Sequence, residues 1–238
     1  MVRNPVLVAL DVPNADQAVR LADRVRDHVG GFKVGLELLM GPGPGTIAAV
    51  AALDLPVFAD AKLHDIPNTV RGAARQLAGM GARWITVHAA GGRVMMEAAV
   101  EGASAGAGSR DIGILAVTVL TSLDAAAAAE VGVSGSPGRQ VARLARLAAS
   151  AGVEGVVCSV KELGDVHQVA PALVRVTPGI RPAGAVSDDQ ARVATPAEAV
   201  RRGADMIVVG RPITRAPDPA VAAAEIEAEI VDSGALDR

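Results

Sequence analysis

The amino-acid sequence predicts an α/β protein, a closed (β/α)8 TIM barrel with eight parallel strands. Three observations support this prediction. Short β-rich runs alternate with helical patterns along the whole chain, which favours βαβ units. The length of 238 residues is close to the roughly 250 that such a barrel needs. Half of the residues are hydrophobic but only 1% are aromatic, so the core must be aliphatic, as in parallel strands buried on both faces.

The strands are expected where Val, Ile and Leu cluster in short runs. In chain order, the eight candidates are Val6–Leu10, Phe32–Leu36, Val57–Lys62, Trp84–Ala89, Ile112–Leu120, Gly155–Ser159, Val174–Ile180 and Met206–Gly210.

Helices are expected between the strands, where apolar residues recur at helical spacing. The first helix would place Leu21 and Val25 on one face, with Asn14 or Asp16 as its N-cap. In chain order, the eight candidates are Ala15–Val29, Gly43–Leu53, Thr69–Gly81, Val94–Ala103, Gly138–Ala151, Lys161–Val169, Pro196–Arg202 and Pro219–Val231.

The alternative architecture is an open, doubly wound sheet. Such a sheet usually has a glycine-rich turn after its first strand, whereas Leu10–Pro13 contains no glycine. No linker or composition shift divides the chain, so residues 1–238 are expected to form a single domain. The segment Ser122–Pro137 is the longest expected irregular loop, and it is a candidate lid over an active site.

Composition argues against several classes of protein. The net charge is −3 and aromatic residues are scarce, which argues against a nucleic-acid partner. No apolar run approaches the ~20 residues of a spanning helix, so no membrane association is expected. The single cysteine, Cys158, reads as a core residue, and the first residues lack a signal-peptide pattern, so we expect a cytoplasmic protein.

Polar residues recur where the strands end, which is where barrel enzymes carry their chemistry. Lys33 and Asp60 lie inside apolar strands, where an unpaired charge is costly, so they are expected to pair. Lys62 is two residues from Asp60 on one strand face, and Asp65 follows in the next loop. These residues predict an alternating acid–base array; a purely structural ion-pair network is the alternative.

A second group of residues predicts a phosphate site. Gly210 and Arg211 follow the last strand, while Arg181 and Gln190 lie in the loop after the seventh. Barrels often bind phosphate at these two loops, through backbone N–H groups and charged side chains. The alternative is an ordinary turn that needs a glycine.

The remaining chemical candidates are weaker. His64 and His88 are expected to brace their loops, and no His–His–carboxylate set has metal-ligand spacing. No Gly-x-Ser-x-Gly elbow is present either. We therefore expect neither a metal nor an organic cofactor.

The segment Asp60–Thr69, read as Asp-x-Lys-x-x-Asp-Ile-Pro-Asn-Thr, resembles the signature of the orotidine 5′-phosphate decarboxylase family. Further matching blocks run in family order from about Val6 to Thr214. They are Ala9–Asp11, Phe32–Gly35, Val87–Gly92, Val117–Ser122, Thr177–Arg181, Asp189–Pro196 and Val208–Thr214.

This resemblance implies the last step of UMP synthesis, the cofactor-independent decarboxylation of orotidine 5′-monophosphate. It implies a homodimer whose active sites are completed by Asp65, Ile66 and Thr69 of the partner subunit. Lys62 would protonate C6 of the pyrimidine, and Asp60 would face the substrate carboxylate. The implied catalytic residues are Lys62, Asp60, Lys33 and Asp65.

The resemblance also implies how the substrate binds. Asp11, Lys33 and Thr69 would contact the ribose, and Thr121 the pyrimidine edge. The implied substrate-binding residues are Asp11, Lys33, Ile66, Thr69, Thr121, Pro178, Arg181, Gln190, Gly210 and Arg211.

Two other functions stay open at this point. The Mg²⁺-dependent 3-keto-L-gulonate 6-phosphate decarboxylases and hexulose-phosphate synthases share the Asp-x-Lys-x-x-Asp core. They differ by an acidic residue where Lys33 stands and by lacking the continuation Ile66–Thr69. The other alternative is a catalytically silent barrel that only binds a nucleotide.

Overall fold

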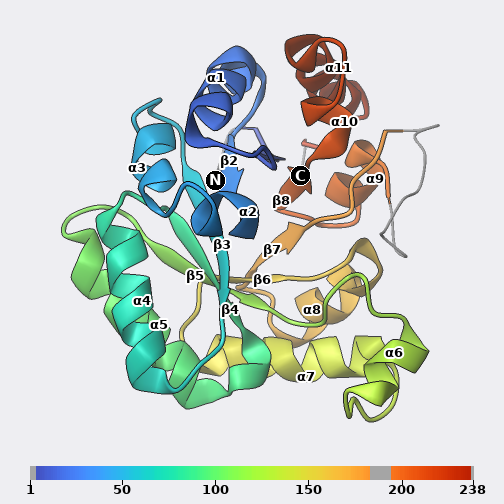
Figure 1. Cartoon of the computed structure of the whole chain (residues 1–238). Helices are drawn as coiled ribbons and strands as arrows, with labels where there is room; N and C mark the ends of the chain where they lie inside the picture. Colours follow the sequence, from blue (N-terminus) through green and yellow to red (C-terminus); the bar gives the residue numbers. More distant parts are fainter. Residues whose placement is uncertain (1–3, 183–193, 237–238) are drawn as a thin grey trace.

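The computed structural model describes residues 4–182 and 194–236. In this part of the chain, eight parallel strands form a closed barrel in sequence order, and β1 pairs with β8. The strands are β1 (Val6–Ala9), β2 (Gly31–Val34), β3 (Val57–Leu63), β4 (Trp84–His88), β5 (Gly113–Val117), β6 (Gly155–Val157), β7 (Val174–Thr177) and β8 (Met206–Val209). The predicted TIM barrel is thus confirmed (Figure 1).

Helices surround the barrel (Figure 1). The α-helices of the described residues are α1 (Ala15–Val25), α2 (Leu36–Met40), α3 (Gly45–Ala51), α4 (Pro67–Gly79), α5 (Arg93–Ala107), α6 (Ala125–Glu130), α7 (Pro137–Ser150), α8 (Leu163–Val169), α9 (Pro196–Arg201), α10 (Arg211–Thr214) and α11 (Pro219–Asp232). Three 3-10 helices accompany them in the same part of the chain: η1 (Arg26–His28), η2 (Ala89–Gly91) and η3 (Val160–Glu162). None of these helices has both the length and the apolar character needed to cross a membrane.

Local chemistry explains where α1 begins. The Asn14 side chain accepts a hydrogen bond from the backbone N–H of Gln17 at 2.9 Å, which satisfies a donor that the first turn leaves unpaired. Of the two expected caps, Asn14 is therefore the one used. The α-helix ends at Val25 and continues as η1, so it is shorter than the expected Ala15–Val29.

Two short helices correct the sequence-based expectations. Leu36 begins α2 instead of ending the second strand. The segment Ser122–Pro137, expected to be irregular, contains α6. The Asp124 side chain accepts from Ala127 N at 2.9 Å and caps α6, and the alanines that follow have the highest helix propensity. A helix of six residues is too short to show apolar periodicity, which is why the pattern missed it.

Hydrophobic side chains fill two layers. One cluster lies inside the barrel and the larger one lies between the strands and the helices. Cys158 is fully buried in the outer layer, as expected. The inner cluster consists of Leu7, Ala9, Phe58, Trp84, Leu115, Val176, Met206 and Val208. This inner packing closes the barrel below the carboxyl ends of the strands, so a cavity can open only above it.

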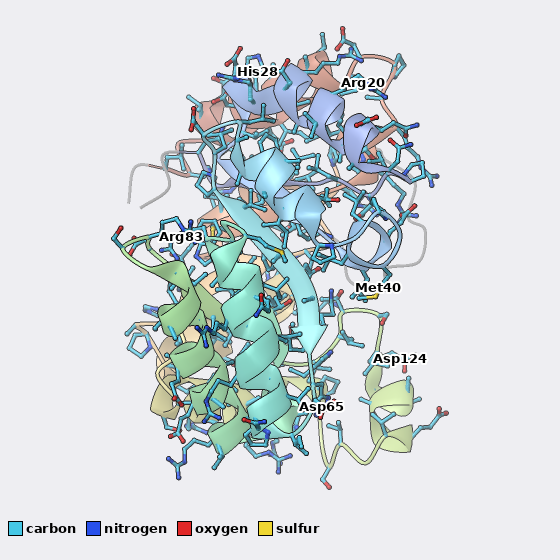
Figure 2. All side chains as sticks on the ribbon, turned by 60° about the vertical axis from the view of Figure 1, so that its left-hand side comes forward. Arg20, His28, Met40, Asp65, Arg83 and Asp124 are labelled. Carbon is cyan, nitrogen blue, oxygen red and sulfur yellow. The ribbon has the colours of Figure 1, made fainter. Side chains whose placement is uncertain are left out.

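A polar cluster occupies the opposite, amino-terminal end of the barrel. Arg83 donates to both carboxylate oxygens of Glu154, at 2.8 and 2.9 Å. The indole N–H of Trp84 donates to the same carboxylate at 3.0 Å, and the Arg83 guanidinium lies 4.7 Å above the Trp84 ring. Figure 2 shows Arg83 and Asp65 at opposite ends of α4, so this cluster lies far from the residues with predicted chemistry.

Candidate active site

A cavity of about 500 Å³ lies at the carboxyl-terminal mouth of the barrel. Its floor is apolar and includes Phe58, Val117 and Val208, while charged residues line its wall. The predicted site residues that line it are Asp11, Lys33, Asp60, Lys62, Thr121, Pro178, Arg181, Gly210 and Arg211. Residues from six strand ends and their loops thus converge on one space, as barrel topology dictates.

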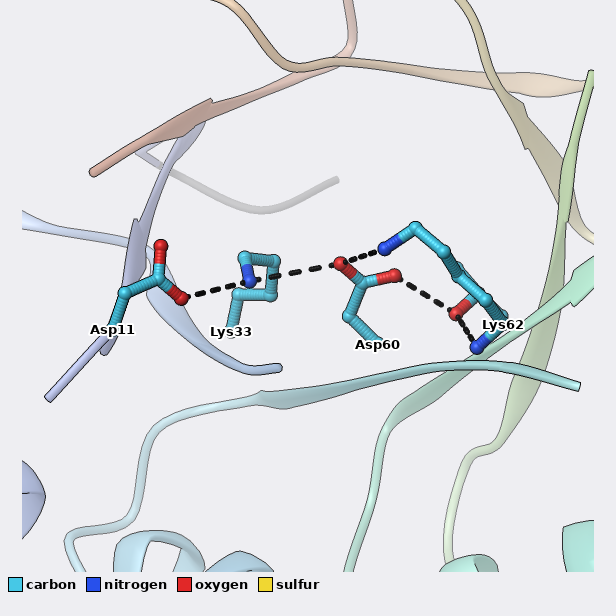
Figure 3. Close-up of polar contacts among 5 residues, drawn as sticks. Asp11, Lys33, Asp60 and Lys62 are labelled. Carbon is cyan, nitrogen blue, oxygen red and sulfur yellow. Dashed lines mark hydrogen bonds and ion pairs between the residues drawn. The ribbon is translucent and has the colours of Figure 1, made fainter. Parts of the chain in front are cut away.

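Four of these residues form a continuous chain of alternating charge (Figure 3). Lys33 Nζ lies 3.3 Å from Asp11 Oδ1 and 3.6 Å from Asp60 Oδ2. Lys62 Nζ lies 2.7 Å from the same Asp60 oxygen. The ion pair expected between Lys33 and Asp60 is therefore present, and Asp60 Oδ2 is shared by two ammonium groups.

The Asp60 carboxylate is buried but ionised. Burial disfavours the charged form, yet the Lys33 and Lys62 ammonium groups, with hydrogen bonds from Lys62 and Thr86, outweigh that effect. The pKa of Asp60 therefore lies below its ordinary value. The site consequently holds a fixed negative charge at neutral pH, beside two cations.

The backbone of β3 is irregular where Lys62 lies. Its pairing with β4 shifts register between Ala59 and Leu63, and Lys62 has a φ of 48°. A left-handed conformation at a residue other than glycine costs about 1–3 kcal/mol and is typical of functional sites. Its backbone N–H is satisfied by Thr86 Oγ1 at 2.9 Å. The expected same-face arrangement of Asp60 and Lys62 is thus reached through a distorted strand end.

Gly35 provides the room in which the Lys33 side chain lies. A Cβ atom at this position would lie 2.7 Å from Lys33 Nζ and 3.4 Å from Asp11 Oδ1. Any other residue would therefore displace the ammonium group from the array.

The lining of the cavity also includes residues expected to hold the phosphate. Gly210 is the N-cap of α10, and Arg211 is its first residue. Arg181 also lines the cavity, in the segment that follows β7. The fourth expected phosphate ligand, Gln190, lies outside the described residues. Two guanidinium groups and the start of a short helix thus line the same cavity as the charged array, and a Cβ at Gly210 would lie 3.6 Å from Asp11 Oδ2.

Asp65, Ile66 and Thr69 do not line the cavity. All three are exposed where α4 begins, and Ile66 has 67% of its surface accessible. The Asp65 carboxylate accepts a hydrogen bond from Ile66 N at 2.6 Å. One chain by itself therefore brings three members of the expected catalytic set together and leaves the fourth at the rim.

Two histidines flank the array at the ends of β3 and β4. The rings of His64 and His88 lie 5.4 Å apart, tilted by 34°. Burial disfavours the His88 imidazolium, and repulsion from His64 and Lys62 adds to this, which together outweigh the attraction of Asp60. The pKa of His88 is thus lowered, and its ring is neutral at pH 7.

Thr86, on β4, is a contributor that the sequence patterns did not reveal. Its hydroxyl donates to Asp60 Oδ1 at 2.9 Å and accepts from Lys62 N. Threonine is common in strands, so its type carries no signal. Its alternation with Trp84 and His88 on the inner face was the available clue.

Two further observations bear on the chemistry. Across residues 4–182 and 194–236, no group of three or more His, Cys, Asp or Glu side chains could hold a metal ion. A second hollow of about 620 Å³ lies between η2 and α7, and its lining residues include neither a lysine nor a carboxylate. The charged array marks the mouth cavity as the candidate active site.

The chain is similar to known proteins over nearly its full length. The model of the "Orotidine 5'-phosphate decarboxylase / HUMPS family" matches residues 4–226. An orotidine 5'-phosphate decarboxylase of Anaeromyxobacter sp. (strain K) is 57% identical over 224 residues, covering 94% of this chain and 96% of that protein. The enzyme of that name from Thermobifida fusca (strain YX) is 52% identical over 233 residues, covering 97% of each chain.

A solved structure agrees with these sequence matches. The crystal structure of orotidine 5'-phosphate decarboxylase from Lactobacillus acidophilus superposes with a TM-score of 0.84 at 39% identity, covering 95% of this chain and 99% of that one. Fold, site geometry and sequence all point the same way: this chain belongs to the orotidine 5'-phosphate decarboxylase / HUMPS family.

Proposed function

We propose that this protein converts orotidine 5'-monophosphate to UMP and CO2, the last step of UMP synthesis. The observation that carries the proposal is the array of Lys33, Asp60 and Lys62 in a cavity whose lining also includes Arg181 and Arg211. Relatives at 48–57% identity bear the name of this enzyme, whereas the family model also covers other activities. Lys33 favours this reaction over those of the Mg²⁺-dependent relatives, which resemble it in the Asp-x-Lys-x-x-Asp core.

The reaction needs an acid beside the carbon that loses CO2. The bond between C6 and the carboxylate breaks, and its electron pair stays on C6, in an orbital orthogonal to the ring π system. The Lys62 ammonium group gives a proton to C6 to form UMP, and the neutral amine regains a proton from water. Because Lys62 is already held 2.7 Å from Asp60, its charge stabilises the carbanion without reorganisation.

Asp60 contributes by repulsion. A substrate carboxylate placed beside this ionised residue is destabilised, and the strain is relieved as CO2 leaves. At a separation of ~4 Å and an effective dielectric of about 20, the repulsion amounts to roughly 4 kcal/mol. Enzymes lower barriers by some 8–23 kcal/mol, so this effect is only one part of the acceleration.

The phosphate would anchor the substrate away from the reacting carbon. Arg211 and the Gly210 amide, with Gln190 and Arg181, are the groups we assign to it. Thr121 and Pro178 would lie along the pyrimidine, and Asp11 and Lys33 along the ribose. Binding energy gained at the remote phosphate can then be used to orient C6 against Lys62.

We further propose that the working unit is a homodimer with shared active sites. Asp65, Ile66 and Thr69 would reach the cavity of the partner subunit. Exposed apolar side chains at the barrel mouth support this, since Met40 and Ile66 have 75% and 67% of their surface accessible. Both residues follow the carboxyl end of a strand, β2 for Met40 and β3 for Ile66, and contact with a partner subunit would cover them. Because β1 closes the barrel against β8, we treat residues 1–238 as one domain.

The direct test is to follow the ultraviolet absorbance of orotidine 5'-monophosphate with the purified protein. Turnover to UMP that persists after EDTA treatment is the expected result. Absence of turnover would contradict the proposed reaction and favour a silent nucleotide-binding barrel. Turnover that EDTA abolishes and Mg²⁺ restores would contradict the metal-free mechanism.

The variant Lys62→Ala tests the proposed acid. Turnover should fall to background because the variant lacks the group assigned to protonate C6, while Lys33, the other ammonium group of the cavity, is assigned to the ribose. The variant should still bind UMP, as calorimetry would show. Its thermal unfolding, followed by circular dichroism, should resemble that of the wild type. Near-normal turnover in this variant would eliminate Lys62 as the proton donor.

A further inference from the structure

Thr86 links the two residues to which we assign the central chemistry. Its side chain is fully buried, on the inner face of β4 between the barrel core and the cavity. We propose that Thr86 is a positioning residue for the decarboxylation, which sets the orientation of Asp60 and, through it, of the Lys62 ammonium group. This proposal rests on the proposed function.

The hydrogen bonds of Thr86 form a closed ring. The backbone N–H of Lys62 donates to Thr86 Oγ1 at 2.9 Å, and the Thr86 hydroxyl donates to Asp60 Oδ1 at 2.9 Å. Asp60 Oδ2 accepts from Lys62 Nζ at 2.7 Å, which returns the ring to the lysine from which it started. The lysine's backbone and its ammonium group are therefore held relative to each other through two other residues.

The ring assigns a separate task to each oxygen of Asp60. Oδ1 is held by the Thr86 hydroxyl, while Oδ2 faces both ammonium groups. A hydroxyl has one proton, so the hydrogen bond given to Asp60 leaves the oxygen's lone pairs to accept from Lys62. Donor and acceptor bonds in series also strengthen one another. Rotation of the carboxylate would break this bond, so its plane is fixed.

The same ring supports the strained backbone of Lys62. A left-handed residue at a register shift has lost its regular strand partners, and Thr86 Oγ1 replaces one of them. Loss of the hydroxyl would leave a partly buried N–H and a buried carboxylate oxygen without this partner at once. The ammonium group would then sample other positions, and the alignment needed for proton transfer would be lost.

Three substitutions test the role. Thr86→Val keeps the shape and removes the hydroxyl, Thr86→Ser keeps the hydroxyl, and Thr86→Cys replaces it with a weak donor. We expect kcat to fall by about 10–100-fold in Thr86→Val, the usual range for a residue that orients others. KM should change by less than about threefold, because the phosphate contacts are untouched. Thr86→Ser should restore most of kcat, and Thr86→Cys should be intermediate.

The matched control is Thr118→Val. Thr118 is also buried, and its hydroxyl donates to the carbonyl of Val157, away from the charged array. The Thr118→Val protein should lose about as much folding stability as the Thr86→Val protein, but its kcat should stay at the wild-type value.

A second measurement does not depend on activity. The pKa of Asp60, followed by NMR of its carboxyl carbon, should rise in Thr86→Val and return toward the wild-type value in Thr86→Ser. Lys33 on β2 and Lys62 on β3 also act on this carboxylate, Asp11 reaches it through Lys33, and the carboxylate in turn acts on His88 on β4. All of them are present in every variant.

Unchanged kcat and an unchanged Asp60 pKa in Thr86→Val would overturn the proposal, as would equal loss of kcat in a folded Thr86→Ser. If Thr86→Val fails to fold, the comparison of Thr86→Ser with Thr86→Cys decides the question in the same way. A wild-type protein without decarboxylase activity would refute the proposed function, yet the pKa measurement would still report whether Thr86 orients Asp60.

Discussion

At the scale of single residues, the strained backbone of Lys62 is stabilised by hydrogen bonds to its neighbours. Lys62 adopts an unfavourable backbone conformation, and its amide and ammonium groups are each held by a buried partner. Gly35 leaves the space that the Lys33 ammonium occupies. Charges arranged in this way need little reorganisation when the substrate arrives, which is the condition for electrostatic catalysis.

Arg211→Ala tests the assigned phosphate site. Loss of a charged hydrogen bond of about 1.5–3 kcal/mol should raise the KM for orotidine 5'-monophosphate by roughly 10–100-fold. Steady-state kinetics would measure it, with orotidine lacking the phosphate as the control substrate, whose slow turnover should be unaffected. Unchanged KM and kcat/KM would place the phosphate elsewhere.

His88 should make folding stability depend on pH. Its pKa is lowered in the folded protein, chiefly by burial and then by His64 and Lys62, so the unfolded chain binds its proton more readily. The contribution is therefore fully present above the unfolded pKa of about 6.5 and is lost as pH falls through the folded pKa.

Urea unfolding between pH 5 and 8 would measure this dependence in the wild type and in His88→Asn. The difference in stability between the two proteins should shrink as the pH falls below about 6.5. At pH 8 the histidine is neutral in both states, so the comparison there reports packing alone. A difference that stays constant across the range would exclude the effect.

Some residues of the site were accessible to sequence reasoning and others were not. A charge inside an apolar strand is conspicuous, so Lys33 and Asp60 stood out, and their ion pair is confirmed. Thr86 was missed because a threonine in a strand is ordinary and its partners are set by the register of β3 against β4. The roles assigned to Asp65 and Gln190 stay predictions, since the former does not line the cavity of its own chain and the latter lies outside the described residues.

At the scale of elements, α4 and α5 pack with their backbones in contact. A Cβ at Gly102 would lie 2.1 Å from the carbonyl oxygen of Arg71, and one at Gly106 would lie 2.1 Å from that of Arg75. α4 begins directly after Asp65 and Ile66. The two glycines therefore fix the position of the segment expected to enter the partner subunit.

Gly102→Ala and Gly106→Ala should each destabilise the protein by about 1–3 kcal/mol, because the backbones must separate. Gly72→Ala is the matched control, since it lies in the exposed part of α4 with nothing within 4 Å of the added Cβ. Alanine there should be neutral or stabilise by about 0.5–1 kcal/mol. Thermal and urea unfolding would compare the three, and equal effects would refute the packing argument.

Sequence periodicity identified the strands better than the short helices. Most strands are short runs rich in aliphatic residues, and parallel pairing leaves few alternatives for such runs. By contrast, α2 and α6 have five and six residues, and their positions depend on caps and neighbours more than on a repeating apolar face. A search for apolar periodicity therefore does not find them, although the Asp124 cap of α6 is itself a local signal.

At the scale of the whole molecule, the proposed dimer makes a specific prediction. Lys62→Ala and Asp65→Ala should each be inactive, because each destroys both active sites of its own dimer. When subunits exchange, half of the dimers are mixed and each has one intact site, so about a quarter of the wild-type activity should return.

The control is a mixture of the Lys62→Ala protein with a protein that carries both Lys62→Ala and Asp65→Ala. This mixture should stay inactive because every site lacks the acid. Failure of the first mixture to recover activity, despite exchange shown by differently tagged subunits, would count against shared sites. Full activity of Asp65→Ala alone would do the same.

The two ends of the barrel have different roles. Binding and chemistry gather at the carboxyl-terminal mouth, whereas Arg83, Glu154 and Trp84 hold the opposite end together. Changes at that far end can adjust heat tolerance without disturbing the geometry around Lys62. Adaptation to temperature and refinement of catalysis can therefore proceed independently in the same chain.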